Sequence, residues 1–167
     1  VIGTERVKRF HDEYWSGMFS VKSGVANTDL ADELSLNITY AENRNNEQHP
    51  DNSINNVYGG FHSRNNTLLA SVTYKETFGN LKLKSYLLAG EITETHYDTQ
   101  ARDYEWDGSY NDITGSQGEF RNLSIFERKD KVLRSNVSVD LAVNNTDKVS
   151  VNLSVNDLSR SGHDEID

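Results

Sequence analysis

The stretch from residue 131 to residue 157 constrains the fold most, because its apolar and polar residues alternate. Apolar side chains dominate the odd positions from Leu133 to Val143, and the pattern resumes from Val149 to Val155. Successive side chains of a β-strand point to opposite faces, so each segment has one apolar and one polar face. The connection at residues 145–147 is Asn-Thr-Asp, which favours a tight turn. The stretch therefore predicts an antiparallel hairpin.

The same alternation recurs upstream, which predicts that the whole chain is all-β. We expect further strands at residues 14–26, 33–42, 67–77 and 81–93. The single proline, Pro50, lies outside these ranges and leaves the strands unbroken. The predicted fold is an antiparallel up-and-down meander of about six strands, and residues 1–167 read as a single segment of one domain.

Short turns and long loops alternate along this predicted meander. The short turns are residues 27–32, 78–80 and 145–147, and the long polar loops are residues 43–66 and 94–130. Alternate connections of a meander lie at the same end, so all the long loops gather at one end. Outer-membrane barrels have this asymmetry, with short periplasmic turns and long extracellular loops. A polar tail is expected at residues 159–167.

The predicted strands also fit the thickness of a bilayer. At ~3.3 Å per residue and a tilt of ~40°, the stretch from Trp15 to Val25 rises roughly 25 Å. Trp15 and Tyr40 lie toward the long-loop end and Tyr74 toward the short-turn end, as an aromatic girdle requires. We therefore predict part of a transmembrane β-barrel wall that faces outer-membrane lipid. The smallest such barrel has about eight strands, so the chain is expected to be one piece of a larger wall.

The composition excludes several classes of function. A net charge of -9 argues against a nucleic-acid partner, because phosphate binding needs a basic face. The chain has no cysteine, which excludes disulfides and thiolate metal sites. No nucleophile elbow or glycine-rich phosphate loop occurs in the sequence. We therefore predict a protein that is not an enzyme and has no cofactor.

Four stretches carry a resemblance to a known family. They are residues 7–14 (VKRFHDEY), 31–34 (ADEL), 57–65 (VYGGFHSRN) and 158–165 (LSRSGHDE). The chain resembles, over nearly its whole length, the barrel region of Bacteroidetes TonB-dependent outer-membrane receptors. The resemblance implies a barrel of about 22 strands, closed by an N-terminal plug domain, in the outer membrane of Gram-negative bacteria. Such receptors import an iron chelate, cobalamin or a glycan with energy delivered by the TonB system. We expect this chain to lack the plug and to depend on the parent protein for transport.

The candidate ligand-binding residues lie in the predicted loops. All five histidines fall at the long-loop end, where imidazole could contact a metal chelate or haem. Aromatic rings alternate with carboxylates around residues 104–120, and such rings bind sugars and planar chelates. The candidates are His49, His62, His96, Tyr104, Trp106 and Tyr110. The alternative is that the histidines are solvated and that the rings pack the loop onto itself.

Two further interpretations remain open. Asp107, Ser109 and Asn111 resemble the start of a calcium loop, but the required glycine and later glutamate are missing, which favours an ordinary acidic turn. The alternative to the receptor is a soluble all-β binding module that recognises carbohydrate through its aromatic loops. In a module the apolar faces pack into a core. In a barrel they face lipid, and the charged residues of the other face, such as Lys22 and Asp140, line a hydrated lumen.

Overall fold

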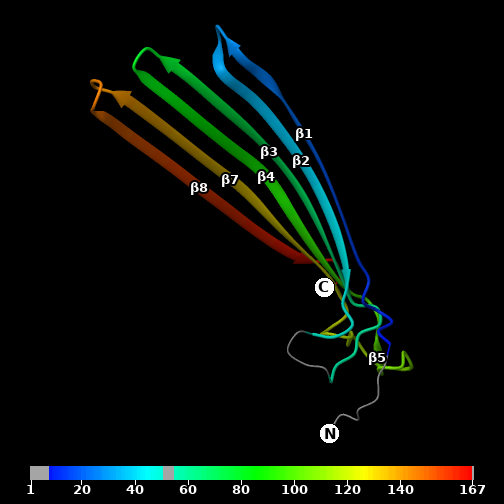
Figure 1. Cartoon of the computed structure of the whole chain (residues 1–167). Helices are drawn as coiled ribbons and strands as arrows, with labels where there is room; N and C mark the ends of the chain where they lie inside the picture. The colour runs from blue at the N-terminus through cyan, green and yellow to red at the C-terminus, as the bar shows by residue number, and fades with distance from the viewer. Residues whose placement is uncertain (1–7, 51–54, 167) are drawn as a thin grey trace.

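The computed structural model describes residues 8–50 and 55–166. Six long strands form one antiparallel sheet, and each pairs with the next long strand along the chain (Figure 1). They are β1 (Tyr14–Thr28), β2 (Ala31–Asn46), β3 (His62–Phe78), β4 (Leu81–Asp98), β7 (Ser124–Ala142) and β8 (Lys148–Asp164). Two short strands, β5 (Arg102–Tyr104) and β6 (Tyr110–Asp112), pair separately. The predicted all-β antiparallel meander is therefore confirmed.

The short turns follow from their residues. Asn27 and Gly79 adopt positive φ angles of 54° and 62°, which glycine and asparagine tolerate best. In the last turn, the Asn144 side-chain oxygen accepts hydrogen bonds from the backbone N–H groups of Thr146 and Asp147, both at 2.8 Å. This side chain substitutes for a backbone turn, as the Asn/Thr/Asp composition predicts.

The strands extend further toward the long loops than the alternation predicts. The expected ranges 33–42, 67–77 and 81–93 are too short, because β2, β3 and β4 continue to Asn46, begin at His62 and end at Asp98. The prediction of a polar tail at residues 159–167 was wrong, because β8 continues to Asp164. Both faces of these extensions are polar, so the sequence shows no alternation of apolar and polar residues there. The long loops accordingly shrink to residues 47–61 and 99–123.

One face of the sheet carries an apolar band. Residues directly opposite one another share a face, and the register links Val25, Leu34, Tyr74, Ser85, Val137 and Leu153 in one row across all the long strands. We call the apolar residues of this face the apolar band. They are Phe19, Val21 and Val25 on β1, Leu34, Leu36, Ile38 and Tyr40 on β2, Leu68, Ala70, Val72 and Tyr74 on β3, Leu81, Leu83, Leu87 and Ala89 on β4, Leu133, Val137, Val139 and Leu141 on β7, and Val149, Val151, Leu153 and Val155 on β8.

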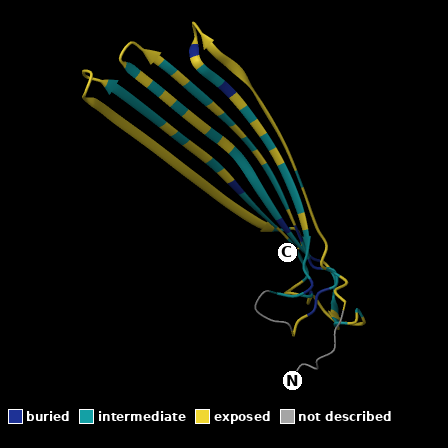
Figure 2. Ribbon diagram, viewed as in Figure 1, coloured by how far each residue is buried: buried dark blue, intermediate teal, exposed yellow. Residues whose placement is uncertain are grey.

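The sheet is a single layer. Within the described ranges, each long strand contacts only its neighbours in the sheet, and no other element covers either face. Phe19 is therefore 68% exposed and Leu36 45% exposed, and both edge strands are exposed along nearly their whole length (Figure 2). The buried apolar residues are Ala31, Val57, Tyr58 and Phe61. All but Ala31 lie at the long-loop end, so the described part of the chain has its one core there. No helix long and apolar enough to cross a bilayer occurs among those residues.

Candidate functional site

The two long loops fold against each other at one end of the sheet (Figure 1). Val57 of the first loop forms a β-bridge with Tyr104 of the second. The first loop is also closed on itself, because the Tyr58 N–H donates to the Gln48 carbonyl at 2.8 Å. These backbone contacts hold segments that lie far apart in the sequence in one compact cluster.

Two carboxylates fix the shape of this loop cluster. Asp98, at the end of β4, is 2% exposed and accepts the backbone N–H groups of Glu119, Phe120 and Arg121 at 2.7, 2.9 and 2.9 Å. Glu119 in turn accepts three successive N–H groups of the first loop, those of residues 59, 60 and 61, at 2.9, 3.1 and 3.1 Å. Hydrogen bonds from several N–H groups to one charged acceptor are among the stronger ones in proteins. The end of β4 thereby anchors the second loop, which anchors the first.

Three aromatic rings pack beside these carboxylates. The ring centroids of Tyr58 and Phe61 are 5.3 Å apart, and Phe120 lies 5.6 Å from Phe61 and 6.2 Å from Tyr58. Burial, reinforced by the negative charge of Asp98, raises the pKa of Tyr58 to about 12. The buried Tyr58 hydroxyl has no hydrogen-bond partner among the described residues. A buried hydroxyl without a partner in the described part of the chain therefore lies beside a set of apolar rings.

A pocket of about 620 Å³ opens next to the rings. Its walls combine the aromatic rings with carboxylates, an imidazole and a guanidinium. The lining residues are Glu47, Pro50, Tyr58, Phe61, His96, Asp98, Phe120, Arg121, Asn122, Ser124, Phe126 and Asp164. The volume falls in the range of pockets that hold small organic ligands, and ring faces with a few polar groups suit a ligand that is partly apolar and partly hydrogen-bonding.

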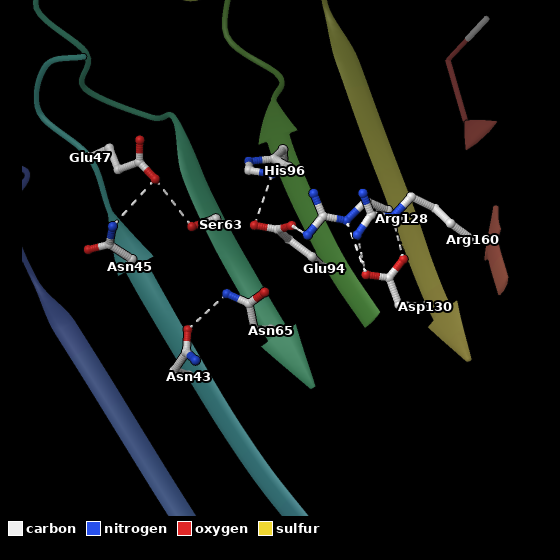
Figure 3. A network of polar contacts seen from close by, with 10 residues as sticks. All are labelled: Asn43, Asn45, Glu47, Ser63, Asn65, Glu94, His96, Arg128, Asp130 and Arg160. Atoms are coloured by element: carbon white, nitrogen blue, oxygen red, sulfur yellow. Dashed lines mark hydrogen bonds and ion pairs between the residues drawn. The ribbon is translucent and has the colours of Figure 1, made fainter. Parts of the chain in front are cut away.

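The pocket belongs to the polar face of the sheet, opposite the apolar band. Below it, polar side chains from several strands join in cross-strand contacts (Figure 3). Arg160 donates two hydrogen bonds to Asp130 at 2.6 and 2.8 Å, Arg128 pairs with Glu94, and Asn65 donates to Asn43 at 3.1 Å. The polar residues of this face therefore satisfy one another along the sheet.

Toward the short-turn end, opposite charges on the polar face also pair. Lys22 lies 3.4 Å from Glu33, and Asp140 lies 3.2 Å from Lys148. These contacts cross between neighbouring strands, as opposite charges on one face of a sheet favour.

The structure separates the predicted ligand residues. His96 alone of the six lines the pocket. The rings of His49 and Trp106 lie 5.7 Å apart, and those of Tyr104 and Tyr110 lie 5.3 Å apart, within the loop cluster. His62 lies on the other face of the sheet, where it stacks on Tyr97 at 4.5 Å. The contacts of His49, Trp106, Tyr104 and Tyr110 match the alternative of ring packing within the loops, whereas His62 and His96 lie on strands.

The residues that shape the pocket could hardly be recognised from their neighbours in the sequence. Asp98 contacts residues 21 to 23 positions further along the chain, and Glu119 contacts residues 58 to 60 positions earlier. The Gly59-Gly60 pair was the one available hint, because adjacent glycines let a backbone approach other groups closely. The partner carboxylate itself has no sequence signature.

The geometry favours an acidic turn over a calcium loop at residues 107–111. The Asp107 carboxylate accepts hydrogen bonds from the Ser109 hydroxyl at 2.6 Å and from the Ser109 N–H at 2.8 Å, which lowers the pKa of Asp107. These bonds form an ordinary Asx turn. Across residues 8–50 and 55–166, no group of three or more histidine or acidic side chains is placed to hold a metal ion.

Comparison with known proteins adds no relative. No protein-family model matches the chain. No curated protein matches it, and no solved structure does. The resemblance to TonB-dependent receptors therefore rests on the four sequence stretches alone.

Proposed function

We propose that this chain is part of the wall of an outer-membrane β-barrel. The observation that carries the proposal is the apolar band, which runs uncovered across every long strand of a single-layer sheet. A soluble sheet buries such a face against a second layer. Exposed apolar surface of this extent needs an apolar surrounding, and lipid supplies one.

The band crosses the strands obliquely, as tilted strands in a membrane require. On β1 it reaches Phe19, whose row runs through the register to Ser159 on β8. On β8 the band already ends at Val155, four residues earlier. With ~3.3 Å per residue and five strand spacings of ~4.8 Å, this offset corresponds to a tilt of about 30°. Membrane barrels have strand tilts of about 35–45°.

The ends of the band support the same interpretation. On five of the six long strands the next position on the same face is polar or charged: Glu42 follows Tyr40, Asn66 precedes Leu68, Glu91 follows Ala89, Lys131 precedes Leu133 and Asp157 follows Val155. On β3 the band from Leu68 to Tyr74 spans about 15 Å of height at ~40° tilt, and Glu76 follows it on the same face toward the turn. A bilayer imposes such a boundary at one level across many strands.

The unpaired edges of the sheet fit a wall that continues on both sides. β1 pairs only with β2, and β8 pairs only with β7, among the elements the structure describes. Long exposed edges recruit further strands, and barrel closure satisfies both of them. Six strands thereby become part of a larger ring.

Within this wall, we propose that the parent protein is a TonB-dependent nutrient receptor. The sequence resemblance implies this class, with a plug domain and the TonB system as partners. The pocket lies on the face that would line the lumen, at the end where long extracellular loops would meet an incoming iron chelate, cobalamin or glycan. Ligand contact by the pocket, not catalysis, is the activity proposed for this segment.

Lipid exposure of the apolar band is tested with a matched pair of variants. Val72 and Ser71 are neighbours on β3 and face opposite ways, and the chain has no cysteine of its own. A bimane fluorophore on the Val72→Cys variant, in vesicles with brominated acyl chains, is expected to be strongly quenched. The same label on Ser71→Cys is expected to be quenched far less. Equal quenching of the two labels, together with a compact monomer in detergent-free buffer, would instead support the soluble-module alternative.

Transport is tested in the host bacterium. Disruption of the reading frame that encodes the chain is expected to abolish growth on one scarce iron chelate, cobalamin or glycan, and removal of TonB is expected to abolish growth on the same nutrient. Growth that survives both changes on every nutrient of these classes would refute the receptor while leaving the barrel wall intact.

A further inference from the structure

We propose that Arg44 and Arg64 form a site for the phosphate group of an anionic lipid in the surrounding membrane. The inference rests on the proposed barrel wall, and it concerns the apolar face of the sheet, away from the nutrient pocket. The two arginines lie on the face of the apolar band, beyond its long-loop end.

The register places the two guanidinium groups on neighbouring strands. Arg44 of β2 lies directly opposite Arg64 of β3, and Trp15 of β1 lies directly opposite Arg44. A pocket of about 330 Å³ opens among them, lined by Trp15, Glu42, Arg44, His62, Arg64 and Tyr97. Two cations and two aromatic rings therefore surround one hollow on the outward face.

The charges in this hollow are not balanced. Arg64 forms an ion pair with Glu42 at 2.6 Å. Arg44 donates to the Asn46 side-chain oxygen at 3.3 Å, and no carboxylate of the described chain lies within ion-pair distance of it. Like charges directly opposite on a sheet destabilise it. An anion between the two arginines would relieve this repulsion, and a phosphate accepts the planar, forked donors of arginine well.

The height of the pair matches a lipid headgroup. Tyr40 ends the band on β2, and its hydroxyl donates to Glu42 at 2.9 Å, which marks the apolar-to-polar boundary. Arg44 is four residues further, about 10 Å higher at ~3.3 Å per residue and ~40° tilt. The polar headgroup zone extends roughly 5–7 Å beyond the hydrocarbon on each side. The long arginine stem lets the charged head reach down into this zone.

A lipid fits the hollow better than a soluble anion does. The apolar band begins directly below it on the same face, so acyl chains attached to a bound phosphate would lie along apolar side chains. Trp15 and Tyr97 add rings at the level where membrane proteins concentrate them. A free phosphate would use the arginines but gain nothing from the band.

The test titrates the full chain, in neutral detergent micelles, with diphosphoryl lipid A as the probe. Trp15 lines the hollow, so its fluorescence in a Trp106→Phe background reports binding. The Arg44→Gln/Arg64→Gln variant is expected to bind at least about tenfold more weakly. The control, Lys84→Gln/Arg134→Gln, removes the same charge from the polar face and is expected to keep the affinity. Single Arg44→Gln preserves the Arg64–Glu42 ion pair, and it is expected to lose part of the binding even if the double variant fails to fold.

Each other outcome overturns the inference in a distinguishable way. Equal affinity of the two double variants would show that Arg44 and Arg64 do not form the site. Inorganic phosphate that competes as tightly as the lipid probe would make the hollow a soluble-anion site. Absence of lipid A binding by the chain that retains both arginines, with an intact Val72 quenching signal, would remove the lipid site and leave the barrel wall standing. Absence of that quenching signal would remove the wall and the lipid site together.

Discussion

The Asp98 carboxylate accepts the backbone N–H of Glu119 at 2.7 Å, while the Glu119 carboxylate accepts the N–H groups of residues 59–61. The support therefore runs in one direction, from the end of β4 to the second loop and then to the first. A substitution of Asp98 should therefore disturb both loops. A substitution of Glu119 should disturb the first loop alone.

Hydrogen exchange tests this order. Asp98→Ala is expected to accelerate exchange at the N–H groups of residues 119–121 and also 59–61, by at least about tenfold, since each bond to a charged acceptor contributes ~1.5–3 kcal/mol. Glu119→Ala is expected to accelerate hydrogen exchange at residues 59–61 and to leave the exchange rates of residues 120 and 121 nearly unchanged. Equal loss of protection in both segments for both variants would mean that the loops open as one unit.

The charge of Glu119 should make the stability of the loop cluster depend on pH. Burial raises the pKa of Glu119 above its ordinary value of 4.5, and the hydrogen bonds from residues 59–61 only partly offset this effect. The folded state then holds a proton that the unfolded state has released, so stability should fall as pH rises from about 4.5 through the raised pKa.

Glu119→Gln is the matched variant for this effect. It retains an oxygen for the three N–H donors but carries no charge, so the fall in stability should be much smaller. Melting of both proteins in detergent between about pH 4 and pH 8 measures the difference. Identical slopes would indicate that other groups govern the pH dependence.

Tyr58 offers a prediction that separates stability from binding. Its hydroxyl is buried without a partner among the described residues, so Tyr58→Phe should stabilise the chain by up to about 1 kcal/mol. The ultraviolet titration should at the same time lose the tyrosine that ionises at about pH 12. If the hydroxyl serves the nutrient ligand, the same variant should bind that ligand more weakly. A destabilised Tyr58→Phe protein would show that the hydroxyl is satisfied in the folded chain.

The strands could be predicted wherever one face is apolar, and not beyond. From Leu133 to Val143 the period of two is plain, because the two faces differ. In the extension of β2, Glu42 and Arg44 occupy one face while Asn43 and Asn45 occupy the other, so no alternation is left to detect. Cross-strand hydrogen bonding continues these strands regardless of the pattern.

The site was less predictable than the fold, for a different physical reason. The histidine and aromatic candidates were chosen by chemical type, but type does not determine the face on which a residue lies. His62 and Ser63 are neighbours, yet His62 faces the side of the apolar band and Ser63 joins the polar network. The carboxylate of Glu119 meets Gly59 from 60 residues away, a contact that only the completed meander creates.

Gly59 should be essential for the contact between the loops. A methyl group at this position would overlap the Tyr104 ring, which packs against the Gly59 backbone. Gly59→Ala is therefore expected to push the loops apart and to accelerate exchange at residues 59–61. The double variant Gly59→Ala/Tyr104→Ala removes the obstacle and should recover part of the protection. If the double variant recovers no protection, the loss of protection in Gly59→Ala arises from the backbone of Gly59 and not from overlap with the Tyr104 ring.

The orientation of the sheet in lipid can be tested energetically with one pair of substitutions on β7. Val137 lies in the middle of the apolar band, in the same row as Leu153, and Asn136 is its neighbour on the polar face. In the proposed barrel wall, an arginine at position 137 would lie near the bilayer midplane, where it costs about 2–4 kcal/mol. Asn136→Arg should cost far less, because its side chain would join the hydrated polar face. Urea titration of both variants in phospholipid vesicles measures the two costs. Similar costs at the two positions would mean that both faces of the sheet meet the same medium, and this would contradict a barrel wall. The apolar–polar alternation of these strands requires that their two faces meet different surroundings.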